Sequence, residues 1–160
     1  MPPGRDKPQG SSTSGVIAPP PILYVAPLLG GLLLDRWFPI SIFASPVATV
    51  AGIVCVCLGF VGLPAVFAFR RAKTSPKPWV PSTALVTSGP YRFTRNPMYL
   101  GFTLLYVGVA LLMNAAWPLL FLPLVLVVMH YGVILREEAY MTQLFGEDYL
   151  RYRARVRRWL

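Results

Sequence analysis

Four long apolar runs constrain the fold of this chain more than any other feature. They cover residues 16–34, 46–69, 97–113 and 117–135. A helix needs roughly 20 apolar residues to cross the hydrocarbon core of a bilayer, and each run comes near that length. In lipid the backbone must satisfy its own hydrogen bonds, which helices do within one segment. The pattern therefore predicts an all-α fold, a polytopic transmembrane helical bundle of about four spans.

The composition agrees with a membrane protein and disfavours two other classes. The mean hydropathy is +0.55, and 55% of the 160 residues are hydrophobic against 13% charged, which a soluble core explains poorly. The net charge of +9 could suggest nucleic acid, but the basic residues flank the apolar runs. We therefore predict the lipid bilayer as partner and no nucleic acid. Cys55 and Cys57 point to different faces of a helix, so neither a disulfide nor a metal site is predicted.

The chain divides into a short polar segment and one domain. Residues 1–15 are rich in Pro, Gly and Ser and offer no apolar surface to bury, so they are predicted to be disordered. Residues 16–160 are predicted to form a single membrane-embedded domain. Only residues 114–116 separate the third and fourth runs, which indicates a tight antiparallel hairpin. Glycines within the spans should let helices approach closely.

The distribution of Lys and Arg predicts the topology. Basic residues concentrate in the loop 70–96 and after the fourth run, and with four spans these segments share one side with Arg5 and Lys7. The other side keeps Arg36, which Asp35 offsets. The positive-inside rule therefore places both termini and the loop 70–96 in the cytoplasm.

The residues after Gly146 have a pattern of their own. Tyr149, Tyr152, Val156 and Trp159 recur at helical spacing, and arginines occupy most positions between them. This predicts a C-terminal amphipathic basic helix. Two placements remain open: on an anionic membrane surface, or with its aromatic stripe packed on the loop before residue 97.

A first polar cluster ends where the third run begins. Gly89-Pro90 indicates a turn, and Asn96 followed by Pro97 is typical of a helix N-cap and first helical position. The free backbone N–H groups of a helix start, with Arg92 and Arg95 close by, suit an anionic group. The alternative is a capped helix start with interfacial arginines.

A second cluster, Arg136-Glu137-Glu138, follows the fourth run. We interpret it as a helix end, where two carboxylates oppose the helix dipole and need a cationic or hydrogen-bonding partner. That partner could be a ligand or a salt bridge from a loop arginine. Because the third and fourth runs form a hairpin, both clusters should lie at one end and form one pocket.

Together these motifs resemble a known superfamily, the isoprenylcysteine carboxyl methyltransferases and phospholipid methyltransferases. The resemblance covers roughly the C-terminal half of the chain. It implies S-adenosylmethionine as cofactor, an integral membrane helical fold, and a lipophilic methyl acceptor reached from the membrane. That acceptor could be isoprenylcysteine carboxylate-like or phospholipid amine-like. The resemblance is carried by L-V-T-S-G-P-Y-R-F-T-R-N-P-M-Y-L-G from Leu85 to Gly101, by Glu137-Glu138, and by Phe145-Gly146-Glu147-Asp148-Tyr149 with Tyr152, Val156 and Arg158-Trp159.

The resemblance also implies residue roles. The implied catalytic residues are Asn96, Tyr99 and Glu137. The superfamily often has histidine where this chain has Asn96, and asparagine cannot act as a base near neutral pH. We therefore expect Asn96 to orient the cofactor. The implied cofactor-binding residues are Thr83, Ala84, Leu85, Val86, Tyr91, Arg95, Asn96, Pro97, Met98, Tyr99, Glu137 and Glu138.

Two other functions remain as alternatives. One is an NADPH-dependent membrane reductase of a lipophilic substrate, although the sequence has no clear pyrophosphate-binding loop. The other is a non-enzymatic membrane scaffold, which would leave Glu137-Glu138 without a role. His130 could line the path of the acceptor, or it could be neutral and bonded to a neighbouring helix. The oligomeric state stays open.

Overall fold

The computed structural model describes residues 13–42 and 45–160. Within these ranges every regular element is helical, so the prediction of an all-α fold is confirmed. Residues 1–12, most of the segment predicted to be disordered, lie outside the described residues. The elements are α1 (Pro20–Trp37), α2 (Ser45–Gly59), α3 (Gly62–Arg71), the 3₁₀ turn η1 (Gly89–Arg92), α4 (Pro97–Leu112), α5 (Ala116–Met129), the π-helical turn η2 (His130–Ile134), α6 (Leu135–Phe145) and α7 (Glu147–Arg155).

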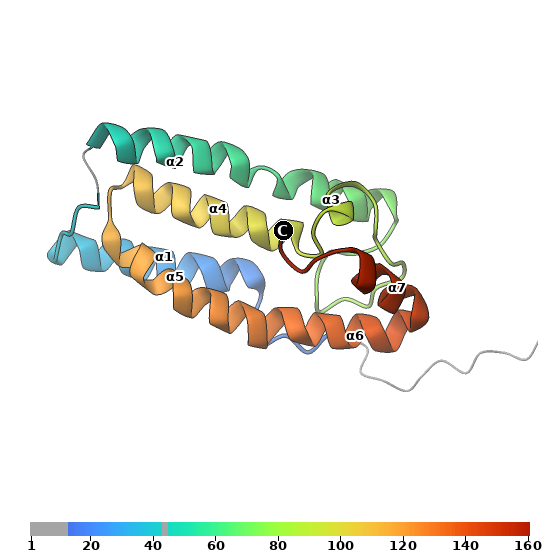
Figure 1. The fold of residues 1–160 in the computed structure, drawn as a ribbon. Helices are drawn as coiled ribbons and strands as arrows, with labels where there is room; N and C mark the ends of the chain where they lie inside the picture. Colours follow the sequence, from blue (N-terminus) through green and yellow to red (C-terminus); the bar gives the residue numbers. More distant parts are fainter. Residues whose placement is uncertain (1–12, 43–44) are drawn as a thin grey trace, which may run out of the picture.

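The long helices lie roughly parallel or antiparallel in an elongated bundle (Figure 1). Helix α4 packs mainly along α2, and α5 packs mainly along α1. The predicted short link between α4 and α5 is present, and Asn114 makes the reversal with a positive φ of 49°. The hairpin partners contact each other less than they contact α2 and α1. The buried Tyr106 hydroxyl still joins them, because it donates to the Pro118 carbonyl at 2.8 Å.

Glycines set the close approach of the helices, as the sequence suggested. A Cβ on Gly108 would lie 3.0 Å from the Gly52 carbonyl oxygen, and a Cβ on Gly101 would lie 2.8 Å from that of Gly59. Both distances are too short for a side chain, so α2 and α4 can pack this closely only through glycine.

The pair Gly30 and Gly31 on α1 gives a direct test of this packing. A Cβ on Gly31 would lie 2.7 Å from the Pro118 backbone nitrogen, whereas a Cβ on Gly30 would meet nothing within 4 Å. We expect Gly31→Ala to destabilise the protein by about 1–3 kcal/mol through overpacking. The matched Gly30→Ala should be neutral or slightly stabilising, because alanine favours helix. Thermal unfolding in detergent measures both, and equal melting temperatures would contradict the α1–α5 contact.

The second apolar run forms two consecutive helices with a short interruption between them. Helix α2 ends at Gly59 and α3 begins at Gly62, and the N–H groups of Phe60 and Val61 bond three residues back instead of four. Pro64 explains the break, since it has no N–H for the Phe60 carbonyl and its ring crowds that carbonyl. The break lies next to the start of α4, because Gly62 faces Gly101 there.

The fourth run continues further than the sequence suggested. Helices α5 and α6 are joined without interruption through η2, and the helix ends at Phe145. The interpretation of Glu137 and Glu138 as a helix end is therefore wrong. Both lie in the first turn of α6, and no glycine or proline stops the helix before Gly146, which has a φ of 52°. The expected conflict with a helix C-terminus does not arise.

Within the described part of the chain, two helices are long and apolar enough to cross a membrane, Pro46–Arg71 and Ala116–Phe145. Helix α4 is a shorter apolar helix. Many large apolar side chains on the outside of the bundle are exposed, including Leu33 (64%), Val50 (63%) and Leu124 (66%). Water around such a surface would be costly, so these features indicate an integral membrane protein. The four-span topology stays a prediction.

The residues directly before α1 are packed, although Ser14 belongs to the segment 1–15 predicted to be disordered. Ser14 is buried, and its N–H and hydroxyl both donate to the Pro78 carbonyl, at 3.2 and 2.7 Å. The Ile17 N–H donates to the Gly132 carbonyl in η2 at 3.2 Å. This segment therefore ties the loop after α3 to the π-helical turn.

Candidate functional site

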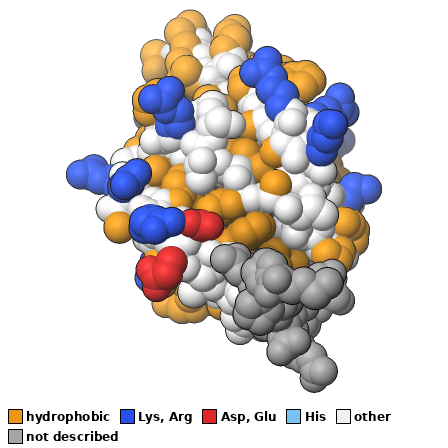
Figure 2. All heavy atoms as spheres, turned by 90° about the vertical axis from the view of Figure 1, so that its right-hand side faces the viewer, with side chains coloured by type: hydrophobic (Ala, Val, Ile, Leu, Met, Phe, Trp, Pro, Cys, Tyr) orange, Lys and Arg blue, Asp and Glu red, His pale blue; other side chains and the backbone are white. Residues whose placement is uncertain are grey.

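A pocket lies at one end of the bundle, where α4 begins and α6 passes it. The loop after α3 and the C-terminal segment complete its walls, and the space including its open mouth is about 830 Å³. Figure 2 shows this end of the molecule, with Lys and Arg side chains around an area that is partly hydrophobic.

Most residues that the sequence marked as candidates meet in this pocket. Thr83 and Pro97 are the exceptions: Thr83 is exposed and bonds to residues 73 and 74, and Pro97 is buried inside the fold. The other ten line the pocket: Ala84, Leu85, Val86, Tyr91, Arg95, Asn96, Met98, Tyr99, Glu137 and Glu138.

One wall is apolar and aromatic. Tyr91 is buried with Val86 and Ala68, and its ring packs edge-on against Phe69 with the centroids 5.5 Å apart. The Tyr152 hydroxyl donates to the Tyr91 carbonyl at 2.8 Å. Burial raises the pKa of Tyr91, and the nearby Glu137 adds to the shift, so the phenol stays neutral. This wall suits a flat, weakly polar group.

Glu137 is the carboxylate that faces the pocket without a cation bound to it. The Tyr99 hydroxyl, from the first turn of α4, donates to its Oε1 at 2.7 Å. Among the described residues no Lys or Arg forms an ion pair with Glu137. A partly buried carboxylate with one neutral donor is suited to receive a positively charged or hydrogen-bonding ligand group.

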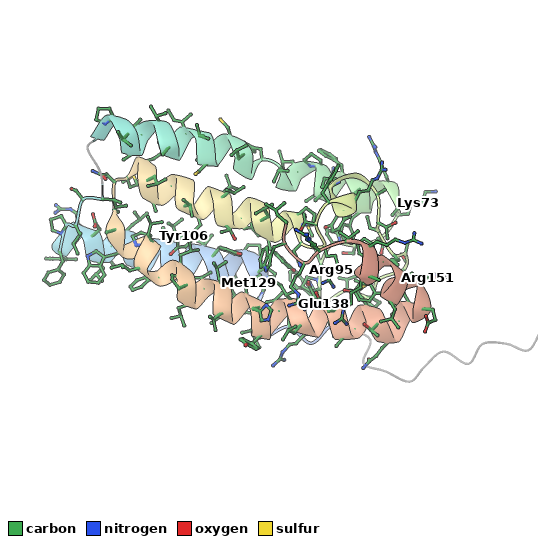
Figure 3. The ribbon with its side chains drawn as sticks, viewed as in Figure 1. Lys73, Arg95, Tyr106, Met129, Glu138 and Arg151 are labelled. Carbon is green, nitrogen blue, oxygen red and sulfur yellow. The ribbon has the colours of Figure 1, made fainter. Side chains whose placement is uncertain are left out.

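Its neighbour Glu138 is fully engaged within the protein. Arg158 binds it with two nitrogens, Nε to Oε1 at 2.9 Å and Nη2 to Oε2 at 2.8 Å. Arg95 Nη1 lies 2.9 Å from the same Oε1, and Figure 3 shows Arg95 and Glu138 together near the start of α4. The hydrogen bonds to Glu138 raise the pKa of Arg158. The sequence left open a ligand or a loop arginine as partner of the pair, and for Glu138 the partners are arginines.

Arg95 gives the pocket a cationic group beside the start of α4. Its side chain is 10% exposed, and its Nε is buried with no hydrogen-bond partner among the described residues. Met98 and Tyr99, from the first turn of α4, also line the pocket, and the N–H groups of a first helical turn have no acceptor within the helix. An anionic ligand group would satisfy both.

Asn96 occupies the N-cap position of α4, with Pro97 as the first helical residue, but its side chain does not cap the helix. Instead, its Nδ2 donates to the Arg158 carbonyl at 3.0 Å. The side-chain cap expected from the sequence is therefore wrong, because the bond to the C-terminal segment orients the Asn96 amide and its Oδ1 accepts from no N–H of the first turn. Asn96 still lines the pocket.

The C-terminal helix α7 ends at Arg155, so the predicted helix was too long: Val156 is extended and Trp159 lies beyond it. Of the two placements left open, α7 adopts the second. Tyr149 is buried and Tyr152 bonds to the loop, so the aromatic stripe packs inward rather than on a membrane. After α7 the chain runs back along the loop before α4. The Arg95 N–H donates to the Arg157 carbonyl at 2.9 Å there.

Sequence reasoning missed several residues that line the pocket. Spacing along α6 could have found some of them, because residues 134, 137, 138 and 141 share one face of a helix. Tyr140 is also in the wall, and its hydroxyl accepts the Ser82 N–H at 3.2 Å. Residues 75–82 of the loop after α3 carried no recognised motif, so nothing in the sequence marked them. The missed residues are Ser14, Phe69, Ser75, Pro76, Lys77, Pro78, Val80, Ser82, Ile134, Tyr140, Met141, Tyr149 and Tyr152.

His130 is not one of the residues that line the pocket. It is partly buried in η2, and its ring packs edge-on against Tyr131 with the centroids 4.8 Å apart. Neither role considered for it receives support from this position.

The fold and the site together define a helical membrane protein with a carboxylate- and arginine-lined pocket at one end. The phospholipid methyltransferase family model matches residues 47–148, which is more than half of the chain, and the chain belongs to that family. A protein-S-isoprenylcysteine O-methyltransferase of Schizosaccharomyces pombe is 38% identical over 72 residues, or 45% of this chain. The chain spans about 30% of the length of that relative. No solved structure matches the chain.

Proposed function

We propose that this protein is an integral membrane methyltransferase that uses S-adenosylmethionine to methylate a lipophilic or lipid-attached acceptor. The observation that supports this most is the arrangement of Glu137 and Arg95 in one pocket. Glu137 has no cation bound to it within the described part of the chain, and Arg95 has a buried Nε without a partner there. An amino acid group carries both complementary charges.

The residues present fit this cofactor. Glu137 would receive its amino group, and Arg95 with the first N–H groups of α4 would receive its carboxylate. The aromatic wall around Tyr91 would take the adenine, because stacking on a phenol ring suits a flat heterocycle. Glu138 would act indirectly, since both of its oxygens already bind arginine. These roles deepen the assignment that family membership suggests.

The cofactor supplies a methyl group on a positively charged sulfur, and the electron pair of the broken C–S bond stays on that sulfur. The protein's part is to align the acceptor and to keep water out. A carboxylate acceptor needs no base for this reaction. An amine acceptor would have to arrive deprotonated, because neither the Asn96 amide nor the Tyr99 phenol is a base near pH 7, and Glu137 would be bound to the amino group of the cofactor. Tyr99 would hold Glu137 in place through its hydroxyl.

The acceptor and the topology belong to the same proposal. The Schizosaccharomyces pombe relative is named for isoprenylcysteine and the family for phospholipids, so the proposal includes both types of methyl acceptor. Four spans with both termini and the pocket in the cytoplasm agree with the distribution of Lys and Arg. The acceptor would then reach the pocket from the membrane.

The test is binding of S-adenosylmethionine to the detergent-purified protein by calorimetry, with NADPH as the comparison ligand. We expect saturable binding of S-adenosylmethionine at micromolar to millimolar concentrations and none of NADPH. Binding of NADPH alone would replace this proposal by the reductase. Binding of neither ligand would favour the alternative function, a non-enzymatic membrane scaffold. Methyl transfer to a prenylcysteine and to a phosphatidylethanolamine then separates the two acceptor types.

A further inference from the structure

Three segments far apart in the sequence meet beside the pocket, and one of them, the C-terminal segment, binds the other two. These segments are the loop 94–96, the first turn of α6 and residues 156–160, which we call the C-terminal strap. The strap's Arg158 binds Glu138 on α6 through two hydrogen bonds of 2.9 and 2.8 Å. Its backbone binds the loop at the same time.

The backbone of the strap satisfies the loop that leads into α4. The Arg158 carbonyl accepts from Thr94 Oγ1 and from Asn96 Nδ2, both at 3.0 Å. Thr94 and Asn96 are buried, so losing this acceptor would leave buried polar groups unpaired. Trp159 packs against the buried cluster around Tyr99 and Ile134, which fixes the strap on its other side.

Glu137 and Arg95, the two charged residues of the proposed cofactor site, both depend on these contacts of the strap. Glu137 directly precedes Glu138 on α6, and Arg95 directly precedes Asn96 in the loop. A shift of Glu138 would move Glu137, and a shift of Asn96 would move Arg95. The bidentate geometry of an arginine on a carboxylate fixes direction as well as distance.

We propose that Arg158 is a positioning residue of the pocket, which sets the separation and orientation of Glu137 and Arg95 for an amino acid group. The Arg158 side chain acts through Glu138, which occupies it with two hydrogen bonds. The Arg158 carbonyl acts through Asn96. The inference rests on the proposed function, because it concerns the same ligand.

The experiment is calorimetric binding of S-adenosylmethionine to Arg158→Gln, at a temperature where circular dichroism shows the variant folded. We expect the dissociation constant to rise about tenfold or more. Arg155→Gln is the matched control, because it removes the same charge from an exposed position on the preceding helix. Its affinity should equal that of the wild type. Arg158→Lys should restore part of the affinity, since lysine keeps the charge without the two parallel hydrogen bonds.

A double variant separates positioning from general loss of structure. If Arg158 acts through Glu138, the affinity losses of Glu138→Gln and Arg158→Gln should combine to less than their product. Losses that multiply would overturn the inference, as would a folded Arg158→Gln or Arg158→Lys with wild-type affinity. In those cases binding by the wild type would leave the proposed function standing. A wild type that binds no S-adenosylmethionine would overturn both.

Discussion

Glu138→Ala is expected to destabilise the protein by about 3–5 kcal/mol. Glu138 is 8% exposed and lies within 2.9 Å of two arginines. Without the carboxylate, Arg95 stays buried with its charge uncompensated, because its side chain is only 10% exposed. Breaking one side of a buried ion pair costs far more than the pair contributes.

Thermal unfolding in detergent measures this effect. A loss of this size should lower the melting temperature by about 10 °C for a chain of this length. Glu147→Ala is the control, because Glu147 is an exposed carboxylate at the start of α7. Its change should stay within about 0.5 kcal/mol. Equal melting temperatures for the two variants would mean that Glu138 does not hold Arg95 and Arg158 together.

Glu137→Gln is expected to have the opposite profile, a large loss of ligand binding with little loss of stability. Glutamine keeps an oxygen that can accept the 2.7 Å hydrogen bond from Tyr99, so the helices should stay in place. It lacks the charge that would meet the amino group of S-adenosylmethionine. A hydrogen bond to a charged group contributes about 1.5–3 kcal/mol, so affinity should fall about 10- to 100-fold.

Calorimetry with S-adenosylmethionine gives the dissociation constant, and thermal unfolding without ligand gives the stability. Glu147→Gln removes an equivalent charge from an exposed position on α7 and should leave both unchanged. The two adjacent glutamates are then distinguished by experiment, one for binding and one for structure. An unchanged affinity in a folded Glu137→Gln would remove Glu137 from the site.

Local features of the sequence were enough to predict the helices and the place of the site. The turn at Gly89-Pro90 and the start of α4 at Pro97 follow from two residues whose backbone angles are restricted. The apolar runs overlap α1, α2 with α3, α4, and α5 with η2 and α6, although the first run begins at residue 16 and α1 only at Pro20. Because residues 114–116 are too few for any other path, the two polar clusters had to meet at one end.

The sequence by itself therefore determined that the chain is helical and apolar, and that its polar motifs share one pocket, because backbone preference and hydrophobicity act between near neighbours in the chain. The tertiary structure alone decided that, among the described residues, Arg95 and Arg158 bind Glu138 and not the adjacent Glu137. It also decided that Asn96 bonds to the tail rather than to its helix, that Ser14 packs against Pro78, and that α7 turns its tyrosines inward. Each of these depends on which donor or acceptor lies closest in space, and in this fold those partners come from residues more than 60 positions away.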